Sequence, residues 1–280
     1  MTYLLVFLGG LIAARCAWSV WERVPKLLRA RGLVRPNFRG HEVPVGAGVH
    51  LILCLVPAYA AASVLLPELH PELPAYLTLL LGFGLLGLLD DARGDRSASG
   101  LGGHLRALLM RRQITTGLAK AVLGLMLCWY VARWMLGLPR LDALAASLTI
   151  ALSANTLNLL DVRPGRAGAF AFVCAGLISL LAWTNHAQTV SGPLLAALWA
   201  LVPLYLADRR GEAMMGDAGS NLLGALLGLA WVLWRPWPSS LWCAVAALAL
   251  LHAVAERWSL TALIERVPPL RVLDRLTGVR

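Results

Sequence analysis

The stretch LDALAASLTIALSANTLNLLD, residues 141–161, decides the fold. It is apolar along most of its length and close to the roughly 20 residues that a helix needs to cross about 30 Å of hydrocarbon. Because a bilayer offers backbone groups no hydrogen-bonding partners, a spanning segment of this kind is predicted to be helical. It ends in Asn158 and Asp161. Carboxylates are costly near a bilayer, so they mark a candidate functional site.

The composition extends this interpretation to the whole chain. The 280 residues are 59% hydrophobic and 14% charged, with a mean hydropathy of +0.69, whereas a soluble domain carries about 25% charged residues. We therefore predict an all-α, polytopic integral membrane protein, a single domain over residues 1–280 with about nine transmembrane helices. The predicted spans are 2–21, 45–66, 73–89, 114–137, 141–159, 166–184, 191–207, 219–234 and 238–262.

Basic residues are distributed unevenly between alternate loops. One set comprises the loops at about 22–44, 90–113, 160–166 and 208–218 and the tail 263–280. Together with the adjoining span ends, it holds every Lys and Arg except Arg15, Arg133, Arg140 and Arg235. The positive-inside rule therefore predicts an outside amino terminus and a cytoplasmic carboxyl terminus. The net charge of +10 is thus explained by membrane topology, and nucleic acid is not expected as a partner.

Three acidic clusters fall on the predicted cytoplasmic face: Asp90-Asp91, Asn158 with Asp161, and Asp217 within the sequence MGDAGS, residues 215–220. Adjacent carboxylates at the end of a helix repel each other and oppose the helix dipole, and a cation would relieve both effects. Taken singly, each cluster has an ordinary alternative, namely solvated acids, a buried amide or a helix N-cap. Their occurrence on one face favours a common site.

The chemistry of these side chains favours a hard cation. Carboxylate and amide oxygens with few histidines nearby point to Mg²⁺, with Mn²⁺ as an alternative, rather than to zinc. Arg163 and Arg166 follow Asp161 directly, and guanidinium groups are suited to phosphate. These features together predict phosphoryl transfer at a membrane surface.

The order of these motifs resembles a known family, the polyprenyl-phosphate N-acetylhexosamine-1-phosphate transferases. The resemblance rests on Asp90-Asp91, on the NLLD sequence of residues 158–161 and on the MGDAGS sequence, its most specific element. The loop RPNFRGHEVPVGAG, residues 35–48, is similar to the first cytoplasmic loop of the family. The resemblance covers about residues 35–230.

The resemblance implies an enzyme of cell-envelope glycan biosynthesis in the bacterial cytoplasmic membrane, with its active site on the cytoplasmic face. Such enzymes transfer a sugar-1-phosphate from a UDP-sugar to undecaprenyl phosphate, release UMP and require Mg²⁺. By position, the catalytic residues would be Asp90, favoured as base, Asp91 and Asp161, and the metal ligands would be Asp217 and Asp161. The substrate-binding residues would be Asn158, Lys120, Arg39, Arg163, Arg166 and His41.

The chain also departs from the family pattern. Pro164 stands where the family often has a further aspartate, and the tail lacks a histidine cluster, which argues against the peptidoglycan step. Two alternatives therefore stay open: a catalytically inactive paralogue that binds lipid phosphate, and a transporter or flippase, whose acids should lie near the bilayer midplane. The donor sugar and the oligomeric state, including a homodimer, are also open. The tail from Ile264 to Leu276 is predicted to be an amphipathic surface segment.

Overall fold

The computed structural model describes residues 13–65, 67–68, 71–93, 116–184, 188–235, 237 and 239–278. Residues 13–21 are helical. The further elements are α2 (Val24–Ala30), β1 (Val34–Pro36), β2 (Glu42–Pro44), α3 (Val49–Leu65), α4 (Leu73–Arg93), α6 (Thr116–Tyr130), η1 (Val131–Met135, a π-helix), α7 (Arg140–Leu160), α8 (Arg166–Thr184), α9 (Gln188–Arg210), α10 (Gly216–Trp234), α11 (Ser240–Arg257), α12 (Leu260–Arg266) and α13 (Pro268–Thr277).

The predicted all-α membrane architecture is confirmed. Seven of the described helices, α4, α6 with η1, and α7 to α11, are long and apolar enough to cross a membrane, and α3 is a shorter apolar helix. The first predicted span lies largely outside the described residues, so the total of nine helices and the orientation of both termini stay predictions. The protein is a multi-pass membrane protein.

Several predicted boundaries need correction. The spans expected at 73–89 and 191–207 are longer, so that Asp90, Asp91 and Asp208 belong to the last turns of α4 and α9. The span expected at 238–262 ends earlier, at Arg257. Ser259 then starts a new helix, because its hydroxyl accepts a hydrogen bond from the Ala262 amide (3.4 Å) as an N-cap does. The amphipathic tail is consequently two short helices, α12 and α13.

Helix α10 occupies the centre of the bundle. It packs against α7 and α4, while α8 pairs with α9 and α3 packs on α4 and α9. Small residues allow the approach: a Cβ on Gly87 of α4 would collide with the backbone of Asp217, and one on Gly48 would collide with that of Gly219. The first turn of α10 is therefore fixed between α4 and the segment that leads into α3.

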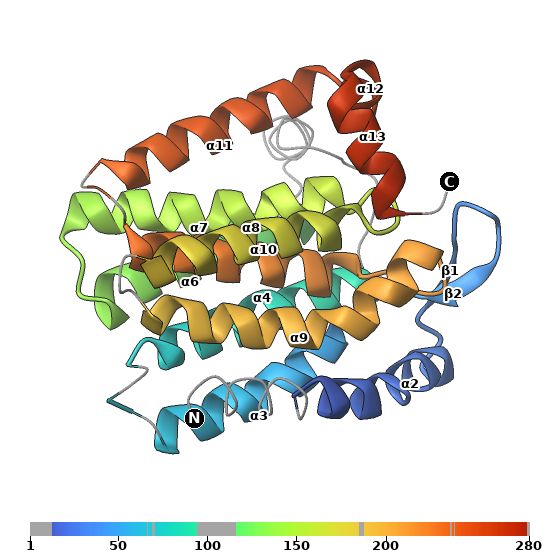
Figure 1. Ribbon diagram of the computed structural model, residues 1–280, viewed down its shortest axis with the longest axis horizontal. Coiled ribbons are helices and arrows are strands. Elements are labelled where there is room, and N and C mark those ends of the chain that lie inside the picture. Colours follow the sequence, from blue (N-terminus) through green and yellow to red (C-terminus); the bar gives the residue numbers. More distant parts are fainter. Residues whose placement is uncertain are drawn as a thin grey trace.

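The two short strands form an antiparallel hairpin in the first predicted cytoplasmic loop, with Arg35 paired to Val43. The chain after the hairpin runs beside the Asp217 loop: the amide of Ala47 donates to the carbonyl of Met214 (3.0 Å), and that of Gly48 donates to the carbonyl of Met215 (2.9 Å). Figure 1 shows the hairpin, α2 and the carboxyl end of the chain at the same end of the molecule.

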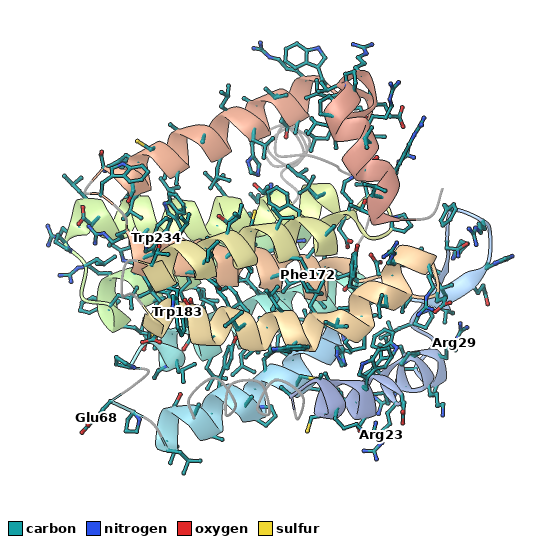
Figure 2. All side chains as sticks on the ribbon, in the orientation of Figure 1. Arg23, Arg29, Glu68, Phe172, Trp183 and Trp234 are labelled. Atoms are coloured by element: carbon teal, nitrogen blue, oxygen red, sulfur yellow. The ribbon has the colours of Figure 1, made fainter. Side chains whose placement is uncertain are left out.

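The side chains at the two ends of the bundle differ. In Figure 2, Arg29 of α2 and Arg23, which directly precedes it, lie at the end that carries the hairpin, whereas Trp183 and Trp234 lie at the opposite end. Tryptophan is enriched at membrane interfaces, and arginine on the cytoplasmic side. This polarity agrees with the predicted topology.

Candidate active site at the hairpin end of the bundle

Asp91, near the end of α4, holds the start of α10. Its Oδ1 accepts a hydrogen bond from the amide of Asp217 (3.0 Å), and its Oδ2 accepts one from the amide of Ala218 (2.9 Å). The residue is only 7% exposed. A carboxylate that accepts the free amides of a first helical turn also complements the positive end of the helix dipole. Asp91, predicted as catalytic, thus has a clear structural task in the fold.

Gly216 makes this arrangement possible. Its φ of +70° lies in the left-handed region that favours glycine, and a Cβ there would stand 2.6 Å from Oδ2 of Asp91. Any side chain would push the α4 carboxylate off the α10 amides. Gly216 therefore leaves room for the Asp91 carboxylate, whose hydrogen bonds fix the position of Asp217.

Asp90 and Asp217 converge on one cationic group. The ammonium of Lys120, in the first turns of α6, lies 2.9 Å from Oδ2 of Asp90 and also donates to Oδ2 of Asp217. These three side chains are each about one-fifth exposed. The sequence analysis expected all three at the site, and the structure brings them together from α4, α6 and α10.

Asn158 completes the cluster from α7. Its Nδ2 lies 3.4 Å from Oδ2 of Asp217, and its Oδ1 accepts a hydrogen bond from the hydroxyl of Ser220 (3.4 Å). Asp161 caps the end of α7 one turn further on. Burial raises the pKa of the Asp161 carboxyl well above its ordinary value, and the nearby carboxylates of Asp208, Asp217 and Asp91 add to this effect.

Two residues of this region were missed by the sequence analysis. Asp208, only 4% exposed, accepts hydrogen bonds from the amides of Gly165 (2.7 Å) and Met215 (3.2 Å). Arg35 donates from its guanidinium to the carbonyl of Asp91 (2.9 Å). The only signal for Asp208 was an acid directly before Arg209-Arg210 at a span end, a pattern that also fits a solvated pair.

The sequence model of glycosyl transferase family 4 matches residues 73–235. These residues include every member of the acidic cluster. The chain belongs to glycosyl transferase family 4. The resemblance found in the sequence is thereby confirmed.

Named relatives agree with this membership in glycosyl transferase family 4. A phospho-N-acetylmuramoyl-pentapeptide-transferase of Bacillus subtilis is 24% identical, over 66% of this chain and 59% of its own length. One of Streptomyces coelicolor is 30% identical, over 67% and 63%. An undecaprenyl-phosphate alpha-N-acetylglucosaminyl 1-phosphate transferase of Escherichia coli K12 is 25% identical, over 74% and 56%. The matches thus cover 56–63% of the length of these three relatives.

The other predicted substrate-binding residues lie apart from the cluster. The guanidinium of Arg166 is buried in an ion pair with Asp274 of α13 (2.8 Å), and its role in substrate binding stays a prediction. Arg163 forms an exposed ion pair with Glu265 (3.1 Å). Arg39 and His41 are exposed on the β1–β2 hairpin. Substrate binding by Arg39, His41 and Arg163 stays a prediction.

The donor atoms of the cluster suit a hard divalent cation. Within the residues that the structure describes, no group of three His, Cys, Asp or Glu side chains is placed to hold a metal ion. Magnesium, however, usually takes one or two protein carboxylates and fills its other positions with water and substrate phosphates. The paired carboxylates of Asp90 and Asp217, already facing a cation in Lys120, fit that requirement.

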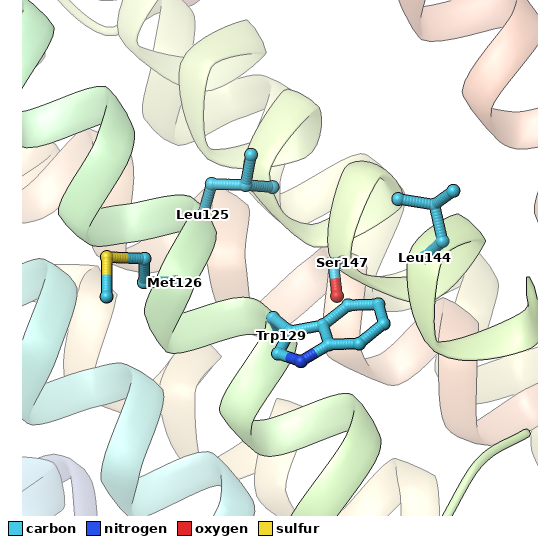
Figure 3. A pocket seen from close by; sticks show the side chains of 5 residues that line it. All are labelled: Leu125, Met126, Trp129, Leu144 and Ser147. Carbon is cyan, nitrogen blue, oxygen red and sulfur yellow. The ribbon is translucent and has the colours of Figure 1, made fainter. Parts of the chain in front are cut away.

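A separate apolar groove of about 280 Å³ lies between α6 and α7. Figure 3 shows its lining: Leu125, Met126 and Trp129 from α6, with Leu144 and Ser147 from α7. The hydroxyl of Ser147 already donates to the carbonyl of Ala143 (2.6 Å). The groove is lined by apolar side chains apart from Ser147 and the indole of Trp129, and it is distinct from the acidic cluster.

Proposed function

We propose that this protein transfers a sugar-1-phosphate from a UDP-sugar to a polyprenyl phosphate and releases UMP, in cell-envelope glycan biosynthesis. The observation that carries the proposal is the convergence of Asp90, Asp217, Lys120 and Asn158 at one end of a membrane bundle. Family membership and the names of the relatives support the same reaction class.

We place this site at the cytoplasmic face of a bacterial inner membrane. The acids lie in the last turn of α4, the first turn of α10 and the end of α7, at the end that carries the basic hairpin and α2. A transporter would be expected to bind its substrate near the bilayer midplane. A site at the membrane surface can instead receive a soluble nucleotide and the phosphate of a membrane lipid together.

In the reaction, an oxygen of the lipid phosphate attacks the β-phosphorus of the UDP-sugar. A new phosphorus–oxygen bond forms, the bond between the β-phosphorus and the bridging oxygen breaks, and UMP leaves with that oxygen. The protein contributes in-line positioning and charge neutralisation, which are the main sources of catalysis in phosphoryl transfer.

Each residue of the cluster has a role in this proposal. Asp217 and Asp161 would hold Mg²⁺ or Mn²⁺, which when bound supplies charge neutralisation for the diphosphate. Lys120 and Asn158 offer N–H donors to phosphate oxygens. Asp90 would accept the proton of a protonated lipid phosphate, and Asp91 keeps the Asp217 loop in place.

The proposal is tested with purified protein, undecaprenyl phosphate and a panel of UDP-sugars. We expect UMP release that requires both the lipid acceptor and Mg²⁺. Asp217→Asn should lower turnover by about 10³-fold, the scale of losing a key electrostatic contact. Asp142→Asn is a matched control, because Asp142 pairs with Arg235 at the opposite end of the bundle. An Asp217→Asn variant with full activity would remove the proposed site, and a folded wild type inactive on every donor would favour a binding paralogue.

A further inference from the structure

The carboxyl-terminal helix α13 packs against the start of α8, at the bundle end that carries the active-site cluster. In Figure 1 the chain leaves the bundle along α11, turns at α12 and returns through α13 to the bundle end. Asp274 of α13 forms a two-pronged ion pair with Arg166, at the start of α8, with nitrogen–oxygen distances of 2.8 and 3.1 Å. Arg166 and Asp274 are only 5% and 7% exposed. Such a buried and bidentate pair has well-defined geometry.

The last turn of α13 also contacts the turn that follows Asp161. Gly165 has a φ of +77°, and a Cβ there would collide with the carbonyl oxygen of Thr277. A Cβ on Gly278 would collide in the same way with the carbonyl oxygen of Pro164, and the hydroxyl of Tyr205 donates to the carbonyl of Thr277 (3.4 Å). The last turn of α13 therefore packs closely on the Pro164–Gly165 turn.

The Pro164–Gly165 turn is connected in turn to Asp217. The amide of Gly165 donates to one oxygen of Asp208, and the other oxygen of Asp208 accepts from the amide of Met215. Met215 directly precedes Gly216 and Asp217 at the start of α10. A continuous set of contacts therefore runs from Asp274 through Arg166, the turn and Asp208 to the aspartate of the site.

We propose that α13 is a positioning element of the active site, in which the Arg166–Asp274 pair and Asp208 fix the loop that carries Asp217. The inference rests on the proposed function only for the catalytic importance of Asp217. It gives Asp208 and Asp274 tasks that the reaction scheme does not assign. It also explains why Arg166, suited to phosphate by its chemistry, is buried against the tail.

Hydrogen exchange of the detergent-solubilised full-length protein tests the structural part. Asp274→Asn should speed amide exchange severalfold in peptides over residues 162–168 and also over 211–218, because exchange follows local opening. Glu265→Gln is the matched control. Its ion pair with Arg163 also joins the carboxyl-terminal tail, here through α12, to the turn between α7 and α8, but this pair is exposed. It should leave both peptides unchanged. Faster exchange in Asp274→Asn confined to the tail would overturn the proposal.

Asp208→Asn is a second variant, which weakens the link that Asp208 makes between Gly165 and Met215. An amide has one acceptor oxygen, so it cannot replace both carboxylate oxygens of Asp208, which accept separately from the amides of Gly165 and Met215. Exchange over 211–218 should therefore rise while α13 keeps wild-type protection, and unchanged exchange over 211–218 would overturn the proposal. This variant decides the matter even if Asp274→Asn fails to fold.

Kinetics provide the functional readout. A misplacement of about 1 Å can cost about 100-fold in rate, so kcat of Asp274→Asn should fall between about tenfold and 100-fold, with Asp274→Glu recovering part of the loss. A wild type without transferase activity would refute the proposed function, while the exchange data would still decide whether α13 holds the loop. Altered exchange with wild-type kcat would restrict α13 to packing and so reject its positioning role.

Discussion

Helices α10 and α11 have nearly the same mean hydropathy, 1.2 and 1.3, and opposite surroundings. Of the most apolar 18-residue stretch of α10, 78% is buried inside the protein, whereas the corresponding share of α11 is 11%. Both helices satisfy the length and composition of a membrane span. Hydropathy therefore identifies the spans of this chain but does not rank them by burial.

Small residues account for the difference. A Cβ on Gly224 of α10 would collide with the carbonyl oxygen of Ser153 in α7, and one on Gly228 would stand 2.7 Å from Cα of Ile150. In α11, large side chains such as Trp242 and Leu250 are 43% and 66% exposed. Because lipid is as apolar as leucine, helices associate in membranes through close backbone packing at small residues. Close packing fixes α10, which is the helix that carries Asp217.

After Asp217→Asn, the largest effect is expected from Lys120→Met, which acts at the functional end of α10. Removing the ammonium takes away a positive charge that Asp90 and Asp217 share, so the affinity for Mn²⁺, measured by electron paramagnetic resonance, should rise. Turnover should nevertheless fall by about 100-fold, because a donor to the phosphates is lost. Lys26→Met, an exposed position on α2, should change neither quantity. Unchanged turnover in Lys120→Met would limit the lysine to balancing charge.

A second test addresses the packing of α10 directly. Gly224→Ala should lower the free energy of unfolding by about 1–3 kcal/mol, because α7 and α10 must move apart. Gly176→Ala in α8 is the matched control, since its Cβ would meet nothing within 4 Å. It should be neutral or stabilising by up to about 1 kcal/mol. Reversible unfolding in mixed micelles measures both, and equal effects would show that close packing does not distinguish α10.

Sequence patterns predicted the spans and the acidic cluster but not the partners of individual side chains. Apolar length and loop charge are local properties, so α7 and α8 were expected within one or two residues of their observed bounds. The hydrogen bonds of Asp91 and Asp208, by contrast, are made to backbone amides of other segments of the chain. The burial of Arg166 depends on Asp274, and no local pattern indicates that pairing. The two short strands were not predicted either, because their register depends on the turn between them.

The third test uses the titration of Asp161. Its raised pKa means that the folded protein keeps a proton that the unfolded chain releases near pH 4. The stability of the cation-free protein should therefore fall as pH rises from about 4 to the folded pKa, and then level off. Mn²⁺ affinity should rise over the same window, by up to about tenfold per pH unit, since the cation needs the ionised form. Asp161→Asn should reduce both slopes, and unchanged slopes would assign them to another group.

The smallest effects are expected at the other end of α10, where Arg235 follows the helix with a φ of 38°. Its guanidinium pairs with Asp142 at 2.9 Å, and both side chains are about one-third exposed. Exposed pairs contribute about 0–1 kcal/mol, so Asp142→Asn should shift the unfolding free energy by no more than that. Arg235→Gly loses the same pair but relieves the left-handed backbone, a gain of about 1 kcal/mol, and should be neutral or slightly stabilising. A loss above about 2 kcal/mol in either variant would mean that this end, too, is fixed as tightly as the end carrying Asp217.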